Sequence, residues 1–257
     1  MDADKVKNSF NNYVSSYNPK DVKIRLKIEH TYFVAAIAKK IAASLSLEEY
    51  DIYLAWLLGM LHDIGRFEQV RRYGTFNDKA SVDHAGLGAD ILFKEELIKG
   101  FVEDGTREYG ELDLIETAVR THSLFRLPED LDTRTKMFCN ILRDADKVDI
   151  FRVQASIPFE DIYSEDKKKD LYFACARDEI MNYVRAHSCI PRMKDRNAFE
   201  IIVSHLALAF ELVYKQSRIE TLEQGYILKM LEFESQNEIA KNQMKFIKKE
   251  IMDTLNN

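Results

Sequence analysis

Apolar residues recur every three or four positions along most of this chain of 257 residues, and that periodicity predicts an all-α protein. A β-sheet protein would show segments of strict apolar and polar alternation, and the sequence contains no such segment. Only nine Gly and four Pro interrupt the chain, which favours long helices joined by few turns. We therefore expect a helical bundle.

The first part of the chain divides into predicted helices and two longer connections. Helices are predicted over residues 2–17, 20–44, 47–61, 81–98, 111–122 and from about 132 through 146. Residues 64–80 and 100–110 lose the apolar periodicity, so both segments are predicted to be loops, the first of them on the surface.

Small polar residues mark where several helices are expected to begin. Ser46 opens a Ser-x-x-Glu capping box, Ser81 is the predicted N-cap of its helix, and Asp132 or Thr133 caps the next one. After residue 150 the chain continues as helices over residues 164–187, with Ser164 as the cap, and over 197–216, 221–233 and 235–254.

The charge balance and the cysteines restrict the class of protein. The net charge of −6, from 37 basic and 43 acidic residues, argues against a nucleic-acid polymer as partner but allows a local basic pocket for one phosphate. Cys139, Cys175 and Cys189 form no Cys-x-x-Cys pair, which is typical of buried thiols in a reducing compartment. The longest apolar stretch, residues 52–61, is too short to span a membrane, and residues 1–10 lack the apolar core of a signal peptide. We expect a cytoplasmic protein without membrane contact.

The histidines form the most informative group of polar residues. Four of the six lie between residues 30 and 122 within or beside predicted helices, and His62 is followed directly by Asp63. Imidazole and carboxylate together suit Mn, Fe, Co, Ni or Zn, and the absence of nearby Cys disfavours a thiolate zinc site. Ligands spaced by 20–40 residues would come from successive helices that meet inside a bundle. A single histidine on an apolar helix face is more often structural than a ligand.

These residues resemble the HD superfamily of metal-dependent phosphohydrolases, whose pattern is H…HD…D. The matching segments are HTYFVAAIAKKIA with His30, LGMLHDIGRF with His62 and Asp63, and RDADKVDIF with Asp146. The resemblance extends over about residues 22–150.

Two further histidines match the additional ligands of the dinuclear members of that superfamily. They are His84 in VDHAGLGADIL and His122 in VRTHSLF. If both are structural instead, the site is mononuclear, as in many relatives. The resemblance implies an HD-type helical core over residues 1–150, in which residues 1–19 form an accessory helix. The amphipathic pattern of residues 151–257, rather than the resemblance, predicts a helical extension that packs on this core and provides one wall of the substrate pocket.

The resemblance also implies a role for each matched residue. A first metal would be held by His30, His62, Asp63 and Asp146. Asp63 would bridge to a second metal, held also by His84 and His122. The expected cofactor is one or two divalent transition metal ions (Mn, Fe, Co, Ni or Zn), with Mg as a further option. Two metals that share a carboxylate can activate a water molecule for attack on phosphorus.

Arg66 is the predicted residue for contact with substrate phosphate. It follows Asp63 by three residues, where relatives carry Lys or Arg, and a guanidinium matches two phosphate oxygens. The alternative is a surface arginine that pairs with Glu68. Weaker candidates of the same kind are Arg71, Arg72, Arg126 and Lys147.

Four other residues near the pattern or of the same type are assigned structural roles. Asp144 and Asp149 flank Asp146 and are predicted to be surface residues or to support the ligands. His187 and His205 lie outside the pattern and are predicted to be structural or exposed.

The favoured function is hydrolysis of a phosphoester or phosphoanhydride in a small, nucleotide-like phosphorylated substrate, with Asp63 and Arg66 as catalytic residues. Two alternatives stay open. Some HD relatives with the same ligand order hold a mixed-valent di-iron centre and cleave C–C or C–P bonds with dioxygen. The chain could also be a non-catalytic, metal-stabilised interaction module. The sequence leaves the oligomeric state open.

Overall fold

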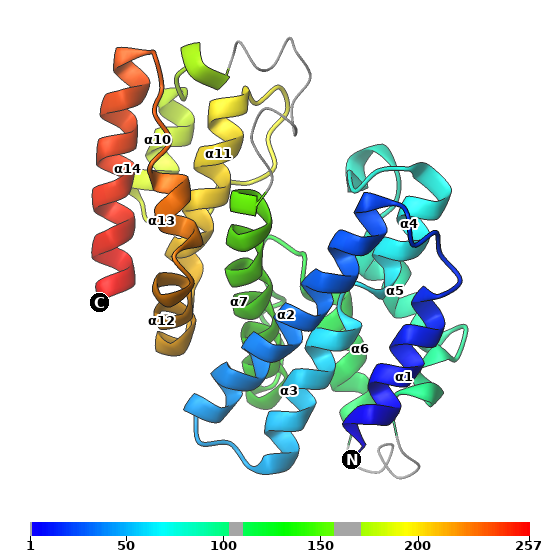
Figure 1. Ribbon diagram of the computed structural model, residues 1–257. Helices are drawn as coiled ribbons and strands as arrows, with labels where there is room; N and C mark the ends of the chain where they lie inside the picture. Colours follow the sequence, from blue (N-terminus) through cyan, green and yellow to red (C-terminus); the bar gives the residue numbers. More distant parts are fainter. Residues whose placement is uncertain (1, 103–109, 157–170) are drawn as a thin grey trace. The chain divides into compact units, whose positions relative to one another are not determined.

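The computed structural model describes residues 2–102, 110–156 and 171–257 (Figure 1). Its regular elements in these ranges are α-helices and short 3₁₀ helices, and none of these residues forms a strand. The prediction of an all-α fold is therefore confirmed. Within the described ranges, every helix is too short or too polar to cross a lipid bilayer.

The chain divides into two compact units, Met1–Asp146 and Lys147–Asn257. The first unit contains α1 (Ala3–Val14), α2 (Val22–Ser44), α3 (Glu49–Leu61), α4 (Ile64–Tyr73), α5 (His84–Phe93) and α6 (Glu111–Thr121), with the 3₁₀ helices η1 (Asp78–Ala80) and η2 (Leu97–Gly100). Helix α7 (Thr133–Ser156) runs across the boundary between the units. Within the first unit α2 packs along α3, α4 packs on α5, and α5 packs on α6.

The α2–α3 pair depends on a residue without a side chain. A Cβ atom at Gly59 of α3 would lie 2.4 Å from the Cα atom of Ala35 in α2, closer than real Cβ atoms come. Glycine therefore allows the two backbones to touch. Because His30 is on α2 and His62 follows α3, this contact brings their side chains to the same place.

A second close approach joins α4 to α5. A Cβ atom at Gly65 would lie 2.2 Å from the carbonyl oxygen of His84 and 2.5 Å from the amide nitrogen of Gly88. Helix packing therefore accounts for the small residues in this part of the sequence. The contact places the start of α5 directly beside the segment that follows Asp63.

Helix α1 packs against α4 through an aromatic cluster. Phe10, Tyr13 and Tyr17 all make ring contacts with Phe67, at centroid distances of 5.9, 6.1 and 5.7 Å. The hydroxyl of Tyr13 also donates a hydrogen bond to the backbone carbonyl of Ile64 at 3.2 Å. The N-terminal helix thus supports the backbone immediately after Asp63.

The prediction of a surface loop over residues 64–80 is wrong for its first half, which forms α4. Every residue from Ile64 to Val70 is buried, polar and apolar alike, so the sequence lacks the two-sided pattern of a surface helix. The helix ends at Gly74, whose φ of 65° is in the left-handed region. Of the other predicted loop, residues 103–109 lie outside the described residues.

Two of the predicted N-caps are wrong. Ser46 has a φ of 56° and lies before the actual cap of α3, Glu48, which makes no side-chain capping bond. The cap of α5 is Asp83 rather than Ser81, because the Asp83 carboxylate accepts bonds from two first-turn amides. Asp132 is confirmed as a cap, since its carboxylate accepts two amide bonds at the start of α7.

The second unit contains α10 (Asp178–Arg185), α11 (Ala198–Leu206), the 3₁₀ helix η4 (Ala207–Glu211), α12 (Lys215–Gln224), α13 (Tyr226–Leu231) and α14 (Glu238–Asn256). The single helix predicted over residues 164–187 is wrong in its described part, because residues 174–177 are not helical; Ser164 lies outside the described residues. Gly225, with a φ of 71°, separates α12 from α13 where one helix over 221–233 was expected. Cys139 and Cys189 are buried free thiols, whereas Cys175 is partly exposed.

Candidate metal centre

The predicted ligands meet in the first unit as two groups of three residues. The first group is His30, His62 and Asp146, and the second is Asp63, His84 and His122. Within each group the potential ligand atoms all lie within 4.8 Å of one another. These residues come from α2, the C-terminal end of α3, the start of α5, the end of α6, and α7. All are buried except Asp146, whose side chain is 19% exposed.

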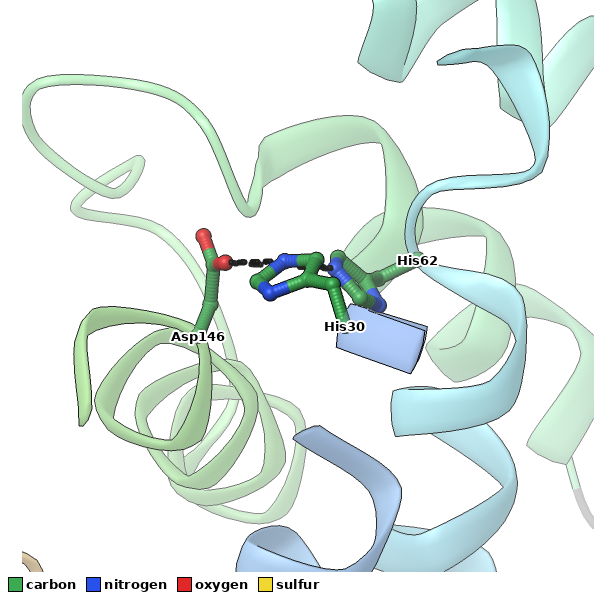
Figure 2. A group of neighbouring side chains, drawn as sticks. All are labelled: His30, His62 and Asp146. Carbon is green, nitrogen blue, oxygen red and sulfur yellow. Dashed lines mark hydrogen bonds and ion pairs between the residues drawn. The ribbon is translucent and has the colours of Figure 1, made fainter. Parts of the chain in front are cut away.

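In the first group the imidazole of His30 lies between the other two side chains (Figure 2). Its Nε2 atom is 3.0 Å from Oδ1 of Asp146 and 3.3 Å from Nε2 of His62. Nδ1 of His62 lies 2.8 Å from the carbonyl oxygen of Gly59, three residues earlier. Because a carbonyl can only accept, Nδ1 carries the proton, and the lone pair on Nε2 faces the group.

In the second group two imidazoles point toward one carboxylate. Nε2 of His84 lies 3.5 Å from Oδ1 of Asp63, and Nε2 of His122 lies 3.8 Å from the same oxygen. Nδ1 of His122 donates to the carbonyl of Val119 at 2.7 Å, while Nδ1 of His84 donates to Oδ2 of Asp78 at 2.9 Å. Both Nε2 atoms therefore carry lone pairs toward the centre of the group.

Asp63 stands between the two groups and offers one oxygen to each. Its Oδ2 atom lies 3.5 Å from Nε2 of His30 and 3.4 Å from Nε2 of His62. Its Oδ1 atom faces His84 and His122, as described above. This is the arrangement that a carboxylate adopts when it can bridge two metal ions.

The electrostatics of the site favour ionised carboxylates and a neutral His122. Burial raises the pKa of Asp63, but the positive charge of Lys27, together with smaller contributions from other neighbours, outweighs it and holds that pKa well below its usual range. The pKa of Asp146 is also lowered, because its interactions with His30 and His62 together outweigh burial. Burial, with repulsion from His84 and His62, lowers the pKa of His122 to about 3. At neutral pH the carboxylates are ionised and His122 is neutral.

The contact between His84 and His122 tests whether this donor set fits a cation. Their Nε2 atoms lie 3.1 Å apart, and both protons are on the opposite ring nitrogens. Burial lowers the pKa of both rings, so neither nitrogen acquires a proton at neutral pH. Two lone pairs at this distance repel each other unless a cation lies with them, and nitrogen and carboxylate donors suit a divalent transition metal.

Comparison with known families agrees with this geometry. Residues 28–151 match the family model of the HD domain. This part of the chain is an HD domain. HD domains bind divalent metals, and most members of the family are metal-dependent phosphohydrolases. The match confirms the resemblance seen in the sequence, and it covers all the residues of the two ligand groups. No curated protein and no solved structure matches the chain.

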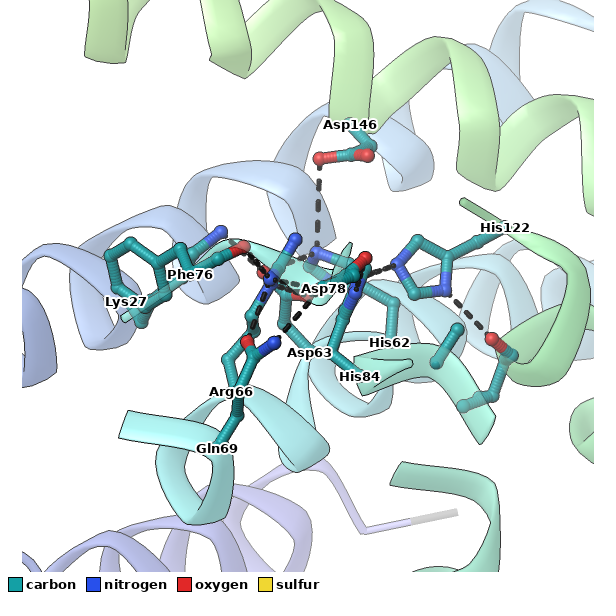
Figure 3. Close-up of polar contacts among 12 residues, drawn as sticks. Lys27, His62, Asp63, Arg66, Gln69, Phe76, Asp78, His84, His122 and Asp146 are labelled. Atoms are coloured by element: carbon teal, nitrogen blue, oxygen red, sulfur yellow. Dashed lines mark hydrogen bonds and ion pairs between the residues drawn. The ribbon is translucent and has the colours of Figure 1, made fainter. Parts of the chain in front are cut away.

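Lys27 is a residue beside the two ligand groups that the sequence analysis missed. Its Nζ atom lies 2.6 Å from Oδ2 of Asp63, and its side chain is 17% exposed (Figure 3). It precedes His30 by three residues, so the helical repeat of α2 places both side chains on one face. That spacing was visible in the sequence and could have identified it. The ammonium also lies 5.5 Å from the ring centroid of Phe76.

Arg66 lies inside the HD domain rather than on its surface. Its Nη1 atom donates to the side chains of Gln69 and Asp78, at 2.7 and 2.8 Å, and to the carbonyl of Phe76 at 2.8 Å. Its Nε atom is buried without a hydrogen-bond acceptor and lies 3.6 Å from Oδ1 of Asp63. The proposed surface pair with Glu68 is therefore wrong.

The weaker phosphate candidates all have other partners. Arg71 and Arg72 both pair with the buried carboxylate of Glu68. The guanidinium of Arg126 stacks on its neighbour Phe125 at 4.2 Å from the ring centroid. Lys147, in the second unit, donates to the carbonyl of Glu211.

The remaining polar candidates are structural, with one difference from the prediction. Asp144 and Asp149 are both fully buried, so neither is a surface residue, and Asp149 accepts two bonds from Arg152 at 2.6 and 3.0 Å. His187 is exposed and bonds Glu250 at 2.7 Å.

Proposed function

We propose that this HD-domain protein is a metal-dependent phosphohydrolase that cleaves a phosphoester or phosphoanhydride bond in a small, nucleotide-like substrate. The observation that carries the proposal is the position of Asp63, with one carboxylate oxygen toward each of two ligand groups. A site built for one ion would not need a second group of buried imidazoles.

The ligands of the first ion would be His30, His62, Asp63 and Asp146, and those of the second would be Asp63, His84 and His122. When bound, two such ions would supply an activated water near neutral pH and would neutralise charge on the phosphoryl oxygens. The family and the donor atoms support divalent Mn, Fe, Co, Ni or Zn, with Mg as a further option.

The chain itself supplies two cationic side chains beside this centre, on the side of Asp63 away from His122 in the view of Figure 3. The ammonium of Lys27 is partly exposed and balances the charge of Asp63. Metal ions on that carboxylate would balance the same charge, which frees the ammonium to bind an anionic substrate oxygen. The guanidinium of Arg66 is fixed by three acceptors and contributes a permanent positive charge next to the same carboxylate. Both side chains favour a phosphorylated substrate over a neutral one.

The proposal is tested by release of phosphate or nucleoside product from a panel of nucleoside mono-, di- and triphosphates and cyclic nucleotides. Each substrate is offered to protein whose metal content has been measured after loading with Mn, Co, Ni, Fe or Zn. We expect metal-dependent turnover that chelation abolishes and that His62→Ala removes. The matched control is His187→Ala, which changes an exposed histidine of the second unit. A fully loaded protein that releases no product from any member of the panel would refute the proposal.

The complete second ligand group also supports a second candidate function, a mixed-valent di-iron oxygenase, because that chemistry needs two metal ions. Iron-loaded protein would then consume dioxygen and give an electron paramagnetic resonance signal from the half-reduced pair. Full turnover of a phosphoester with a redox-inert ion such as Zn would exclude this alternative.

A further inference from the structure

The histidines of the centre are not held in position in the same way. His62 and His122 follow the last residues of α3 and α6, and each Nδ1 atom bonds the backbone carbonyl three residues earlier. A carbonyl of the preceding helical turn is available to any residue at a helix end. His84 is the first residue of α5, so no helical turn precedes it. Its orienting acceptor must come from another part of the chain.

That acceptor is the carboxylate of Asp78, in the 3₁₀ helix between α4 and α5. Oδ2 of Asp78 lies 2.9 Å from Nδ1 of His84. A carboxylate is a stronger acceptor than a carbonyl, and it makes the imidazole a better electron donor to a metal at the other nitrogen. The N-terminal end of α5 makes the imidazole a weaker electron donor, because the positive end of the helix dipole disfavours positive charge on His84.

Asp78 is itself held in place by α4. Its Oδ1 atom accepts hydrogen bonds from Nη1 of Arg66 and Nε2 of Gln69, both at 2.8 Å. The amide of Gln69 also donates to Oγ of Ser81 at 2.9 Å, which ties the same helix to the segment before α5. These bonds from α4 fix the position of the Asp78 carboxylate beside His84.

We propose that Asp78 is a positioning residue for the second metal ion, fixing His84 with its proton on Nδ1 and its Nε2 lone pair toward Asp63 and His122. This inference rests on the proposed metal centre and assigns a side-chain support to one ligand of its second half. Loss of such a partner weakens metal affinity by about 10- to 100-fold in comparable sites. The first ion should be affected less, because the bonds of Asp78 to Arg66, Gln69 and His84 support the second ligand group.

A different role for Asp78 has to be distinguished by the test. Ligand atoms of Asp78, Asp83 and His84 also lie within 4.8 Å of one another, so these three residues could bind an ion of their own. Asp83 separates the two possibilities. Its carboxylate caps α5 by accepting bonds from two backbone amides, and Asn at this position would keep the cap. Asp83→Asn therefore removes a potential ligand without removing the helix start.

The experiment is calorimetric titration of the metal-free full chain with Mn²⁺ and Co²⁺, with stoichiometry checked by elemental analysis. We expect wild type and Asp83→Asn each to bind two equivalents, and we expect each affinity in Asp83→Asn to equal the corresponding affinity in wild type. Asp78→Ala should keep the first equivalent and bind the second 10- to 100-fold more weakly. Asp78→Asn should fall between them, because an amide oxygen accepts the same bond without the charge. Retention of the first equivalent also shows that each variant is folded.

A second readout reports the position of the proton. In the metal-free protein, ¹⁵N spectra of the histidine rings should show His84 protonated at Nδ1 in wild type and a mixture of tautomers in Asp78→Ala. An unchanged second affinity in Asp78→Ala would overturn the inference, as would an equal loss in Asp83→Asn. Two equivalents with the expected losses, but no hydrolysis of any phosphoester, would refute the proposed function and leave this inference standing.

Discussion

The two ligand groups of the HD domain have similar donors but different supports. In the first group His30 and Asp146 lie within the long helices α2 and α7, and a helical carbonyl orients His62. In the second group His84 depends on Asp78, a residue between helices that is held by side chains of α4. His84 of the second group is therefore fixed by a polar side-chain network, whereas His62 of the first group and His122 of the second are fixed by backbone carbonyls.

This difference indicates which ion's binding is more sensitive to substitutions. Backbone hydrogen bonds within a helix persist through most side-chain substitutions, whereas a network of buried polar side chains fails when one member is removed. We expect the first ion to bind more robustly and the second ion to respond to substitutions in α4 and in the segment after it. Turnover that needs both ions would then be controlled through the second.

The largest expected contrast comes from removing one ligand of each group. His62→Ala should abolish binding of the first ion and lower turnover by at least about 1,000-fold, since the activated water would be lost. His84→Ala should lose one metal equivalent and most of the turnover while keeping the other equivalent. Elemental analysis and initial rates on the same preparations measure both effects. If His84→Ala keeps full turnover, the working site is mononuclear.

Substitutions at Gly65 and Gly59 should also affect the two ions differently. Gly65→Ala forces α4 and α5 apart at His84 and should destabilise the fold by about 3 kcal/mol, because a methyl group has no space there. It should weaken the second ion most. Gly59→Ala, which separates α3 from α2 at Ala35, should weaken the first ion most. Urea unfolding gives the stability change, and metal titration tests the separation; equal loss of both ions in both variants would contradict it.

His205 of α11 shows how desolvation changes the pKa of an imidazole that lies outside the two ligand groups. Desolvation, together with the charges of Arg196 and Arg192, lowers its pKa to about 4. The imidazole therefore becomes protonated near pH 6.5 in the unfolded chain but only near pH 4 in the folded chain. The free energy of unfolding falls as pH decreases between these two values. Between pH 7 and pH 5 the loss from this one group is about 2 kcal/mol. Urea unfolding of metal-free His205→Gln should show a shallower pH dependence by this amount, and an unchanged slope would show that the ring is not desolvated.

The smallest expected effect distinguishes two roles of Arg66. If it mainly fixes Asp78, Arg66→Lys should weaken the second ion by roughly tenfold, about 1.4 kcal/mol, because an ammonium cannot replace the forked guanidinium. Substrate KM at saturating metal should then change little. If Arg66 mainly binds substrate phosphate, KM should rise while metal affinity stays constant. Titration and steady-state kinetics on one variant give both numbers.

The sequence was sufficient for the parts of the structure that follow a periodic or an ordered pattern. Helical spacing predicted the all-α fold, and the ordered histidines and aspartates identified the residues that meet in space. His84 and His122 could be paired only by resemblance to relatives, because nothing local joins two positions separated by a loop. The periodicity failed for α4, where the polar residues Arg66 and Gln69 are buried because they bind Asp78 beside the ligand groups.

The supports of the centre were harder to predict than its ligands. Asp78 lies in a segment without periodicity, and its bonds to Arg66 and His84 appear only after α4 and α5 have packed through Gly65. Lys27 carried a readable signal, its helical spacing from His30, that a search restricted to metal ligands overlooks. Metal ligands can be recognised in the sequence from their residue types and order. The residues that orient those ligands can be recognised only once the tertiary contacts are known.

The central claim is that Asp63 joins two metal ions, and anomalous diffraction from crystals grown with Mn²⁺ tests it most directly. The account predicts two peaks about 3.5–4 Å apart, one beside each carboxylate oxygen of Asp63. One peak would lie among His30, His62 and Asp146, and the other beside His84 and His122. A single peak, or a peak among Asp78, Asp83 and His84 with none at His122, would contradict it.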